Sequence, residues 1–295
     1  MSTASALYPA ELQQRVDAYL AGLSLGGTAQ GVETLVEAMR YSLLAGGKRV
    51  RPVLALATAE ALGHDAESVL PFAGAIEMIH TYSLIHDDLP AMDDDELRRG
   101  QPTCHVAYGE DVAILAGDGL FAEALRLAAA EQQADPAALL AAVAELTAAV
   151  GVDGMVGGQF LDVTAPGDLG PADLRRVHEL KTGRLIAASV NCVLHLCQAS
   201  PSARLSYGRF AAELGVLFQI VDDILDVTGD DTALGKPSGS DERHGKRTYV
   251  TVFGLDRARE LARESHSEAR AALAESAGDT ETLERVADHI LTRQN

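Results

Sequence analysis

Six carboxylates fall within ten residues at 87–96, and two arginines, Arg98 and Arg99, follow them. The acids are Asp87, Asp88, Asp93, Asp94, Asp95 and Glu96. A solvated acidic loop can have this composition, but these acids follow the mostly apolar run Ala75–Ile85. Neighbouring carboxylates in a partly dry site stay ionised only beside a cation. Mg²⁺ prefers such oxygen ligands and bridges them to phosphates, which arginines also bind. The stretch therefore predicts a magnesium-dependent phosphate or diphosphate site.

A second acidic cluster lies on a predicted helix between Leu214 and Asp226. Its apolar stripe is Leu214, Leu217, Phe218, Val221 and Leu225, and the polar stripe beside it is Gln219, Asp222, Asp223 and Asp226. A solvated flank of an ordinary helix is the alternative interpretation. Apolar neighbours on both sides favour burial instead, and buried charges are normally paired or metal-bound. Asp222 and Asp226 are one turn apart and can share a cation.

The helix that precedes the first cluster carries a polar line. His80, Ser83 and Asp87 are spaced i, i+3 and i+7, so they share one face. A lone histidine there would ordinarily be a core residue, but the carboxylate on the same line favours ligand contact. Pro90 ends the helix after Asp88, so we expect Asp93 to reach the site from a loop.

Basic residues occur in three places where glycines or polar residues surround them. Lys48, Arg49 and Arg51 follow Gly46-Gly47, Lys181-Thr182-Gly183 lies inside a predicted helix, and Lys236 and Lys246 lie in or near a polar loop at 230–246. A solvated surface charge is the default interpretation of each of these groups taken singly. Glycines beside basic residues also allow backbone N–H groups and side chains to converge on a phosphate.

Composition limits the other possibilities. The chain has 295 residues, 47% of them hydrophobic, and a formal charge of −19, with no long basic run, so nucleic acid is an unlikely partner. Three cysteines without paired spacing indicate core residues in a reducing cytosol rather than a disulfide framework. A charged start followed by an apolar segment is missing at the N-terminus, so we expect a cytoplasmic protein.

The elements that must position these residues are helical. Helical periodicity dominates almost every segment, aromatics are 4%, and no Asn-Gly hairpin signal occurs. No low-complexity linker divides the chain, which predicts one all-α domain over 1–295. Charges interrupt Ala-rich runs such as Val112–Ala130, so these read as packed helices and we expect no stable membrane insertion. Four glycines at 151–158 indicate close packing of backbones or ligand.

These motifs resemble, in order, those of the short-chain polyprenyl diphosphate synthases, and most closely the bacterial farnesyl diphosphate synthases. They span about two hundred residues. They are Gly-Gly-Lys-Arg-Val-Arg-Pro at 46–52, Asp-Asp-x4-Asp at 87–93 with Arg98-Arg99, Gly-Gly-Gln-x-x-Asp at 157–162, Lys181-Thr182-Gly183, Phe218-Gln219-x-x-Asp222-Asp223-x-x-Asp226, Gly235-Lys236 and Lys246-x-Thr248-Tyr249.

The resemblance implies a single-domain isoprenoid synthase fold, with long helices around a deep central pocket, and a homodimer. It implies that Asp87, Asp93 and Asp222 bind Mg²⁺ directly, and that Asp88, Asp223 and Asp226 assist directly or as supporting partners. About three Mg²⁺ ions are expected, with Mn²⁺ as a substitute.

The resemblance also assigns the substrates. Arg98, Lys181 and Lys236 would hold the allylic diphosphate (dimethylallyl, then geranyl). The residues expected to hold isopentenyl diphosphate are Lys48, Arg51, His80 and Arg99. Lys246 would lie in the loop that closes over the site. Ionisation of the allylic C–O bond gives a cation that oxygens of Thr182 and Gln219 can stabilise. The catalytic set is thus Arg98, Lys181, Thr182 and Gln219.

Two features bear on the product. Four residues separate the aspartates of the first motif, as in bacterial farnesyl and geranylgeranyl types. Tyr82 lies five residues before Asp87, about 7.5 Å along a helix, where a bulky side chain would end the pocket, while its neighbour Ser83 is small. We therefore expect farnesyl diphosphate, with geranyl and geranylgeranyl diphosphates as alternatives.

Two rival functions remain open. A non-catalytic partner subunit would usually lose an Asp-rich motif, and both are intact here. A terpene cyclase would not need the isopentenyl set Lys48, Arg51 and His80. One departure from the family pattern is the C-terminus, where relatives often have a basic tail. This chain ends Arg293-Gln294-Asn295 with a single cation, which gives little reason to expect Arg293 as a ligand.

Overall fold

The computed structural model describes residues 8–26, 29–164, 170–229 and 247–293. These residues are almost entirely helical, so the predicted all-α class is confirmed. The first half contains α2 (Ala10–Gly22), α3 (Glu33–Leu43), α4 (Val50–Ala61), the 3₁₀ turn η1 (Ala66–Val69), α5 (Leu70–Asp87), α6 (Cys104–Tyr108) and α7 (Glu110–Ala130). The second half contains α8 (Pro136–Val150), α9 (Met155–Thr164), α10 (Pro171–His178), η2 (Glu179–Gly183), α11 (Arg184–Leu196), α12 (Pro201–Thr228), α15 (Tyr249–Phe253), α16 (Leu255–Ala274) and α17 (Glu281–Thr292).

A short hairpin was not predicted. Strands β1 (Leu97–Arg98) and β2 (Gln101–Pro102) pair antiparallel, with Arg98 opposite Gln101. Arg99 and Gly100 form the turn, and both have positive φ, as the tight two-residue connections of hairpins require. The sequence lacks the Asn-Gly signal, so the turn was visible only in the structure. Its effect is to turn Arg98 back toward the end of α5.

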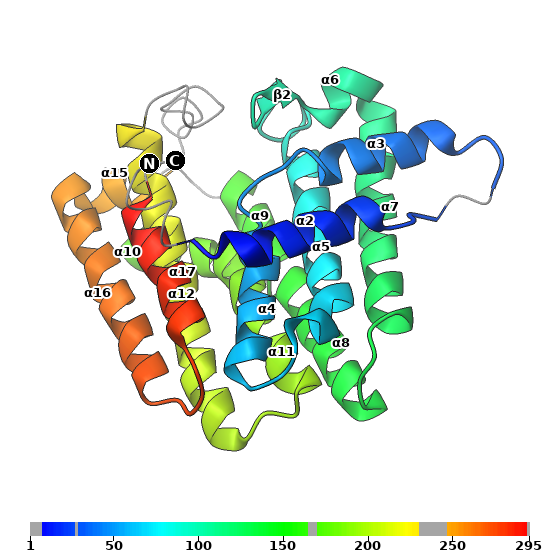
Figure 1. Cartoon of the computed structure of the whole chain (residues 1–295). Helices are drawn as coiled ribbons and strands as arrows, with labels where there is room; N and C mark the ends of the chain where they lie inside the picture. The colour runs from blue at the N-terminus through cyan, green and yellow to red at the C-terminus, as the bar shows by residue number, and fades with distance from the viewer. Residues whose placement is uncertain (1–7, 27–28, 165–169, 230–246, 294–295) are drawn as a thin grey trace.

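Helices α4 and α5 form the centre of the molecule. Both are apolar on nearly every side, and nearly all of α4 and most of α5 are buried, as expected of helices without a polar face. In Figure 1, α2 and α3 lie across the helices that run upright in that view. The end of α5 is thereby held in a frame of helices on several sides, which fixes where Asp87 emerges.

The second acidic helix, α12, is the longest, with 28 residues. It begins where the Ser200 side chain accepts a hydrogen bond from the Ala203 N–H, with Pro201 in the first turn, a standard helix start. It packs between α11 and α16, and Leu214, Leu217 and Val221 are buried as the predicted apolar stripe requires. The polar stripe beside them therefore faces the interior of the helical assembly.

A widened helical turn interrupts the helix that was predicted around Lys181-Thr182-Gly183. Residues 179–183 form a π-turn between α10 and α11, and such turns often occur at functional sites. The turn is pressed against α9, since a Cβ at Gly158 would overlap the Lys181 backbone. The prediction that the 151–158 glycines permit close packing is confirmed at this contact, which orients Lys181 and Thr182.

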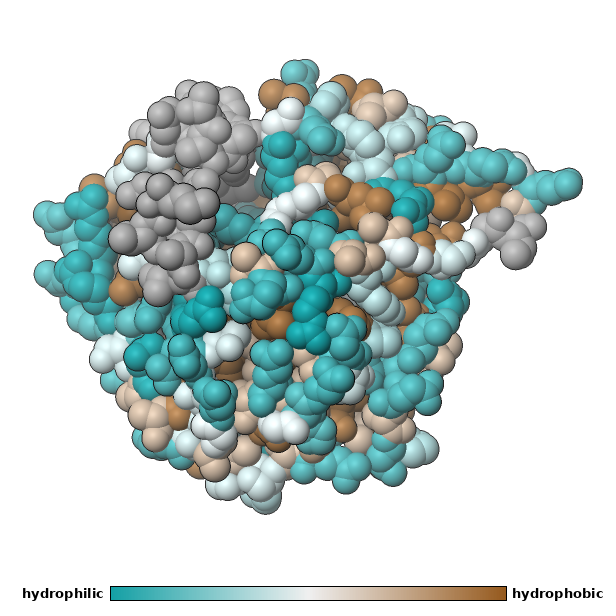
Figure 2. Space-filling model, in the orientation of Figure 1, coloured by the Kyte–Doolittle hydropathy of each residue, from teal (hydrophilic) through white to brown (hydrophobic). Residues whose placement is uncertain are grey.

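Two surface features complete the fold. The face seen in Figure 2 is largely hydrophilic. Among the described residues, Pro136–Thr164 is the one stretch apolar and long enough to cross a membrane, which is weak evidence by itself. A turn at 151–154 interrupts that stretch, and α8 packs on α11 through Ala138, Ala142 and Leu146. All three cysteines are reduced, and Cys104 and Cys192 are buried, in agreement with the core role predicted for them.

Candidate active site

The predicted site residues converge on one cavity of about 760 Å³. Its walls come from the start of α4, the end of α5, the hairpin, α9, η2 and α12. Predicted residues on its lining are Arg51, His80, Tyr82, Ser83, Asp87, Arg98, Arg99, Lys181, Thr182 and Asp222. Sequence reasoning did not single out Met155 and Phe160, which form an apolar part of the wall together with Phe218 of the predicted apolar stripe. One cavity therefore joins a charged rim to an apolar interior.

Both acidic helices contribute to the wall of this cavity. Asp87 ends α5, and Asp222 lies on α12. Asp93 lies in the turn after α5, as predicted, and its N–H donates to the Asp87 carbonyl at 2.9 Å, but Asp93 is not part of the cavity lining. Asp226, one turn beyond Asp222, is buried and does not reach the lining.

The donor set suits a hard divalent cation. Among the described residues, no three acidic, histidine or cysteine side chains gather as one closed cluster. Mg²⁺ does not need such a cluster, because it commonly takes one or two carboxylates and completes its octahedron with phosphate oxygens and water. Asp87 and Asp222 across a shared cavity offer that arrangement, so these residues fit Mg²⁺ held jointly with a diphosphate.

Asp88 differs from its neighbour Asp87. It is 3% exposed, faces away from the main cavity, and accepts hydrogen bonds from the Arg98 Nε at 2.8 and 2.9 Å and from its Nη2. Burial raises the pKa of this carboxyl although Arg98 opposes the shift. The structure thus gives Asp88 a supporting position, in which it fixes the Arg98 guanidinium at the cavity wall.

A chain of hydrogen bonds orients the residues predicted to stabilise a cation. The Tyr249 N–H donates to Asp223 at 2.7 Å, and the Gln219 Nε2 donates to the other Asp223 oxygen at 2.8 Å. A carboxylate can only accept, so the amide nitrogen of Gln219 must face Asp223 and its oxygen must face Thr182. The Thr182 hydroxyl donates to that oxygen at 2.8 Å. Thr182 therefore presents lone pairs to the cavity, and Gln219 and Asp223 hold it in place.

Lys181 is positioned by an ion pair. Its ammonium lies 2.6 Å from Asp162 on α9, and both side chains are only about one-fifth to one-quarter exposed. The predicted Gly-Gly-Gln-x-x-Asp motif at 157–162 thereby gains a physical role: its glycines admit η2, and its aspartate holds the lysine that η2 carries.

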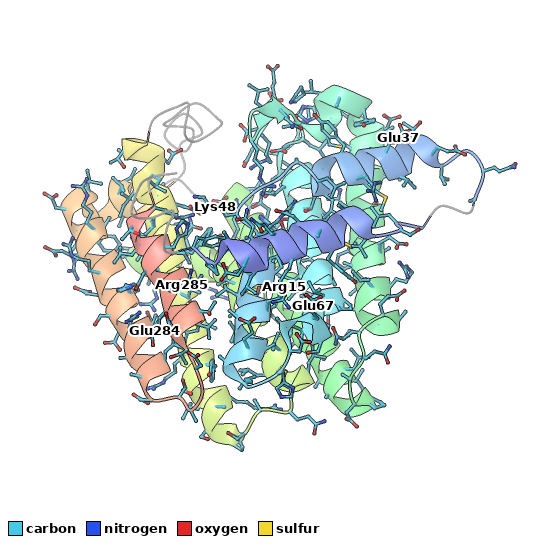
Figure 3. All side chains as sticks on the ribbon, viewed as in Figure 1. Arg15, Glu37, Lys48, Glu67, Glu284 and Arg285 are labelled. Carbon is cyan, nitrogen blue, oxygen red and sulfur yellow. The ribbon has the colours of Figure 1, made fainter. Side chains whose placement is uncertain are left out.

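The basic residues after Gly46-Gly47 have different surroundings. Arg51 is buried at the cavity wall and its Cζ lies 5.8 Å from the Phe218 ring centre. Lys48 lies near the start of α2 (Figure 3), and burial and the Arg293 charge lower its pKa to about 8. Burial, followed by the Arg51 charge, also lowers the pKa of His80 well below its usual value, so its ring is neutral. Lys48 and Arg51 are thus cations in a partly dry site, where the binding of an anion is strongly favoured.

Arg49 does not belong to this set. It is 3% exposed and points into the core, where it pairs with Glu77 at 2.7 Å and with Asp17 at 2.9 Å, and it donates to the Leu43 carbonyl. Its backbone adopts the left-handed region at φ 52°. Arg49 therefore points into the core, whereas Arg51 faces the cavity.

The two arginines after the first motif also diverge. Arg98 is held by Asp88, whereas Arg99 donates to the Gly46 carbonyl beside the basic turn. Both line the cavity. Their separation agrees with the prediction that they serve different diphosphates, although it does not test which.

Arg293 lies against the acidic helix α12, a position that sequence reasoning did not predict. It is 9% exposed, pairs with Asp222, donates to the Phe218 carbonyl at 3.1 Å, and stacks over the Phe218 ring at 4.2 Å. A single cation in the tail was a weak sequence signal, but α17 delivers it to the acidic helix. The predicted ligands Lys236 and Lys246 lie outside the described residues.

Tyr82 is one of the aromatic residues that line the cavity. It is 9% exposed, and its ring meets Phe121 edge-on at 5.3 Å and His86 at 5.9 Å. Ser83 lines the cavity beside it, and its hydroxyl donates to the His80 carbonyl at 2.9 Å. The bulky side chain predicted to limit the pocket is thus at its wall, backed by other rings.

Comparison with known proteins assigns this architecture. Residues 32–290 match the polyprenyl synthetase family. The chain is 46% identical over 268 residues to farnesyl diphosphate synthase of Escherichia coli, covering 88% of this chain and 89% of that protein. It is 45% identical over 267 residues to the heterodimeric geranylgeranyl pyrophosphate synthase large subunit 1, chloroplastic, of Arabidopsis thaliana, covering 88% and 72%.

A solved structure agrees with these relatives. A geranyltransferase from Helicobacter pylori, complexed with magnesium and isoprenyl diphosphate, superposes with a TM-score of 0.82 at 32% identity, covering 99% of this chain and 97% of that one. The chain belongs to the polyprenyl synthetase family. Within that family its activity is that of a short-chain prenyltransferase.

Proposed function

We propose that this protein makes (2E,6E)-farnesyl diphosphate by condensing isopentenyl diphosphate with dimethylallyl and then geranyl diphosphate. The observation that carries the proposal is one cavity whose lining joins Asp87 and Asp222 to the cationic side chains Arg51, Arg98, Arg99 and Lys181, and to Tyr82 and other large side chains. The charged rim suits two diphosphates, and the apolar interior suits a prenyl chain. The 46% identity to the Escherichia coli farnesyl diphosphate synthase supports the same product.

Each step of the proposed reaction can be assigned to residues of the cavity wall. The allylic C–O bond breaks, and the leaving diphosphate keeps the electron pair while Arg98 and Lys181 offset its charge. The Thr182 hydroxyl oxygen, oriented by Gln219, faces the allylic cation. The double bond of isopentenyl diphosphate attacks this cation to form the new C–C bond, and the released diphosphate accepts the proton that is then lost. Apolar side chains such as Phe218 exclude water, which would otherwise capture the cation.

We assign Mg²⁺ to Asp87, Asp93 and Asp222, with Asp88 and Asp226 in supporting positions. When bound, Mg²⁺ would offset the charge that develops on the departing diphosphate. The magnesium in the Helicobacter pylori geranyltransferase structure supports the choice of metal. Arg51, His80 and Arg99 line the cavity, and Lys48 precedes Arg51 by three residues, so we assign these four residues to isopentenyl diphosphate.

Product length is the finer part of the proposal. Tyr82 favours a short product, because its bulky, largely buried ring lines the cavity and packs against Phe121. Geranylgeranyl diphosphate is the second candidate, since a geranylgeranyl synthase matches the chain at 45% identity. The length of chain at which the purified enzyme stops decides between them.

One incubation separates these functions from their rivals. Purified protein is mixed with isopentenyl diphosphate and dimethylallyl diphosphate, with Mg²⁺ or with a chelator, and the products are dephosphorylated and separated by chain length. Farnesol in the Mg²⁺ sample alone is the expected result. A cyclic hydrocarbon would indicate a terpene cyclase, and absence of any condensation product would indicate a non-catalytic subunit and refute the proposal.

We also propose that the protein is a cytoplasmic homodimer. Large apolar side chains are exposed outside this cavity on neighbouring segments, and they are Leu115 of α7, Leu140 of α8 and Val152 of the turn that joins α8 to α9. Exposed apolar groups that gather on one region commonly mark a protein interface. Sedimentation of the purified protein should give twice the 31.0 kDa mass of the chain, and Leu140→Asp should lower it. A monomer at micromolar concentration would contradict the assignment.

A further inference from the structure

The tyrosine that lines the cavity is supported by a second aromatic ring. The Tyr82 ring packs edge-on against Phe121 of α7, with ring centres 5.3 Å apart and planes at 81°. Phe121 is partly buried and is not part of the cavity lining. It therefore forms a second layer, hidden behind the first.

The two helices meet in an antiparallel register that repeats once per turn. Tyr82 faces Phe121, and one turn nearer the catalytic end His86 faces Gly117. At the far end, a Cβ at Gly74 would lie 3.3 Å from the Leu127 side chain, which continues the same pairing. Because α5 and α7 run antiparallel, each turn of α7 supports one side chain of α5. That turn therefore determines how far the α5 side chain extends toward the prenyl chain.

Gly117 and Phe121 act on the cavity in opposite senses. The His86 imidazole lines the cavity, and its Nε2 lies 3.0 Å from the Ile114 carbonyl oxygen. A Cβ at Gly117 would overlap that imidazole. With α7 behind it, the ring can only move toward the cavity. Removal of the Phe121 ring has the reverse effect, because the Tyr82 ring can then tilt away from the cavity.

We propose that Gly117 and Phe121 of α7 are specificity-determining positions that fix the depth of the prenyl pocket through His86 and Tyr82. Phe121 holds the Tyr82 ring across the end of the cavity, and Gly117 leaves room for His86 to stay withdrawn from it. Both residues act by positioning another side chain and neither contacts the substrate. The inference rests on the proposed function, since it requires a growing prenyl chain in this cavity.

The next side chain expected to stop a growing prenyl chain is Met78, one helical turn deeper than Tyr82. Met78 precedes Tyr82 by four residues on α5 and is 1% exposed. One turn corresponds to about 5.4 Å, comparable with one isoprene unit. A variant without both aromatic rings should therefore lengthen the product by about one unit beyond the Tyr82 variant and then stop again.

The test compares product lengths of four variants with the wild-type enzyme under identical substrate ratios. Phe121→Ala should raise the ratio of the next longer product to the wild-type product by about two- to tenfold, which corresponds to loss of an aromatic pair worth about 0.5–1.5 kcal/mol. Gly117→Ala should raise the proportion of the next shorter product. The double variant Tyr82→Ala/Phe121→Ala should give longer products than Tyr82→Ala alone.

Leu120→Ala is the matched control. It removes a fully buried side chain from the same helix but lies outside the cavity lining, so it should lower stability and leave the product ratio unchanged. Thermal unfolding checks that each variant is folded, and Phe121→Leu replaces Phe121→Ala if the latter does not fold.

The outcomes separate the inference from the function on which it rests. No condensation by the wild-type enzyme would refute the proposed function. Condensation by the wild type with unchanged ratios in the Phe121 and Gly117 variants would refute only the role of α7. A shift of both variants in the same direction, or an equal shift in Leu120→Ala, would also overturn it, because general loosening of the helix would then explain the effect.

Discussion

The buried ion pair beneath the basic turn gives the sharpest test of how this site is supported. The Arg49 Nη1 lies 2.7 Å from Glu77, and both side chains are only 2% exposed. Replacing Glu77 with glutamine keeps the shape and leaves the guanidinium without its buried counter-charge. Removal of one partner of a buried pair costs about 3–5 kcal/mol, a large part of the roughly 5–15 kcal/mol that stabilises a typical domain.

The chain contains a control with the same geometry and a different environment. Arg15 and Glu67 are also 2.7 Å apart, but their side chains are 35% and 51% exposed, and Figure 3 labels both near the surface. Exposed pairs contribute about 0–1 kcal/mol, so Glu67→Gln should change stability by no more than that. Urea unfolding monitored by circular dichroism gives the free energy of unfolding of each variant.

A double variant separates the ion pair from general damage. Arg49→Met/Glu77→Leu removes both charges and should recover much of the loss, because no unpaired charge then remains buried. Equal losses in Glu77→Gln and Glu67→Gln would refute the argument that burial makes this pair important. A double variant as unstable as the sum of both single variants would refute the argument that the unpaired charge is the cause.

Three further predictions concern activity. Tyr82→Ala should shift the products of the purified enzyme to longer chains, and an unchanged product profile would remove Tyr82 as the length-limiting residue. Asp87→Ala should lower kcat by about 10²-fold or more while leaving the unfolding midpoint nearly unchanged, as expected of a group that acts on the reacting diphosphate; near-normal turnover would exclude it from the metal site. The pKa of Lys48 is lowered to about 8, so its ammonium carries charge below that pH and loses it above. The KM for isopentenyl diphosphate should therefore rise between about pH 7 and 9, and Lys48→Arg, which stays charged, should flatten that rise; an identical profile in the variant would assign the titration to another group.

Much of the site could be predicted because its chemistry is concentrated in short motifs. A helix ends between Asp87 and Asp93, and Pro90 indicates that end in the sequence. Asp222 lies on a helix whose apolar stripe is evident from the spacing of its residues. These are local relations, and helix geometry converts them into positions with little help from the rest of the chain. The resemblance of the motifs to a family supplied the substrates, which spacing alone did not.

Other roles depended on contacts between distant segments. From the sequence, Lys48, Arg49 and Arg51 form one basic group. In the structure, Arg49 pairs with Glu77 in the core, whereas Arg51 lines the cavity. Arg293 looked like an ordinary tail residue, but α17 brings it to Asp222, which is 71 residues away along the chain. The second layer at Phe121 has no local signal at all, because it exists only in the register between α5 and α7.

The sequence by itself determined the all-helical class and the two acidic helix ends, and it predicted the kind of ligand expected there, since each follows from residue type and spacing within one helix. The tertiary structure decided which charges face the cavity and which support the core, how Asp223 and Gln219 orient Thr182, and what lies behind Tyr82. The physical reason is that burial and hydrogen-bond partners are properties of packed pairs of helices. Periodicity along one helix indicates that a face is buried, but not which side chain of another helix covers it.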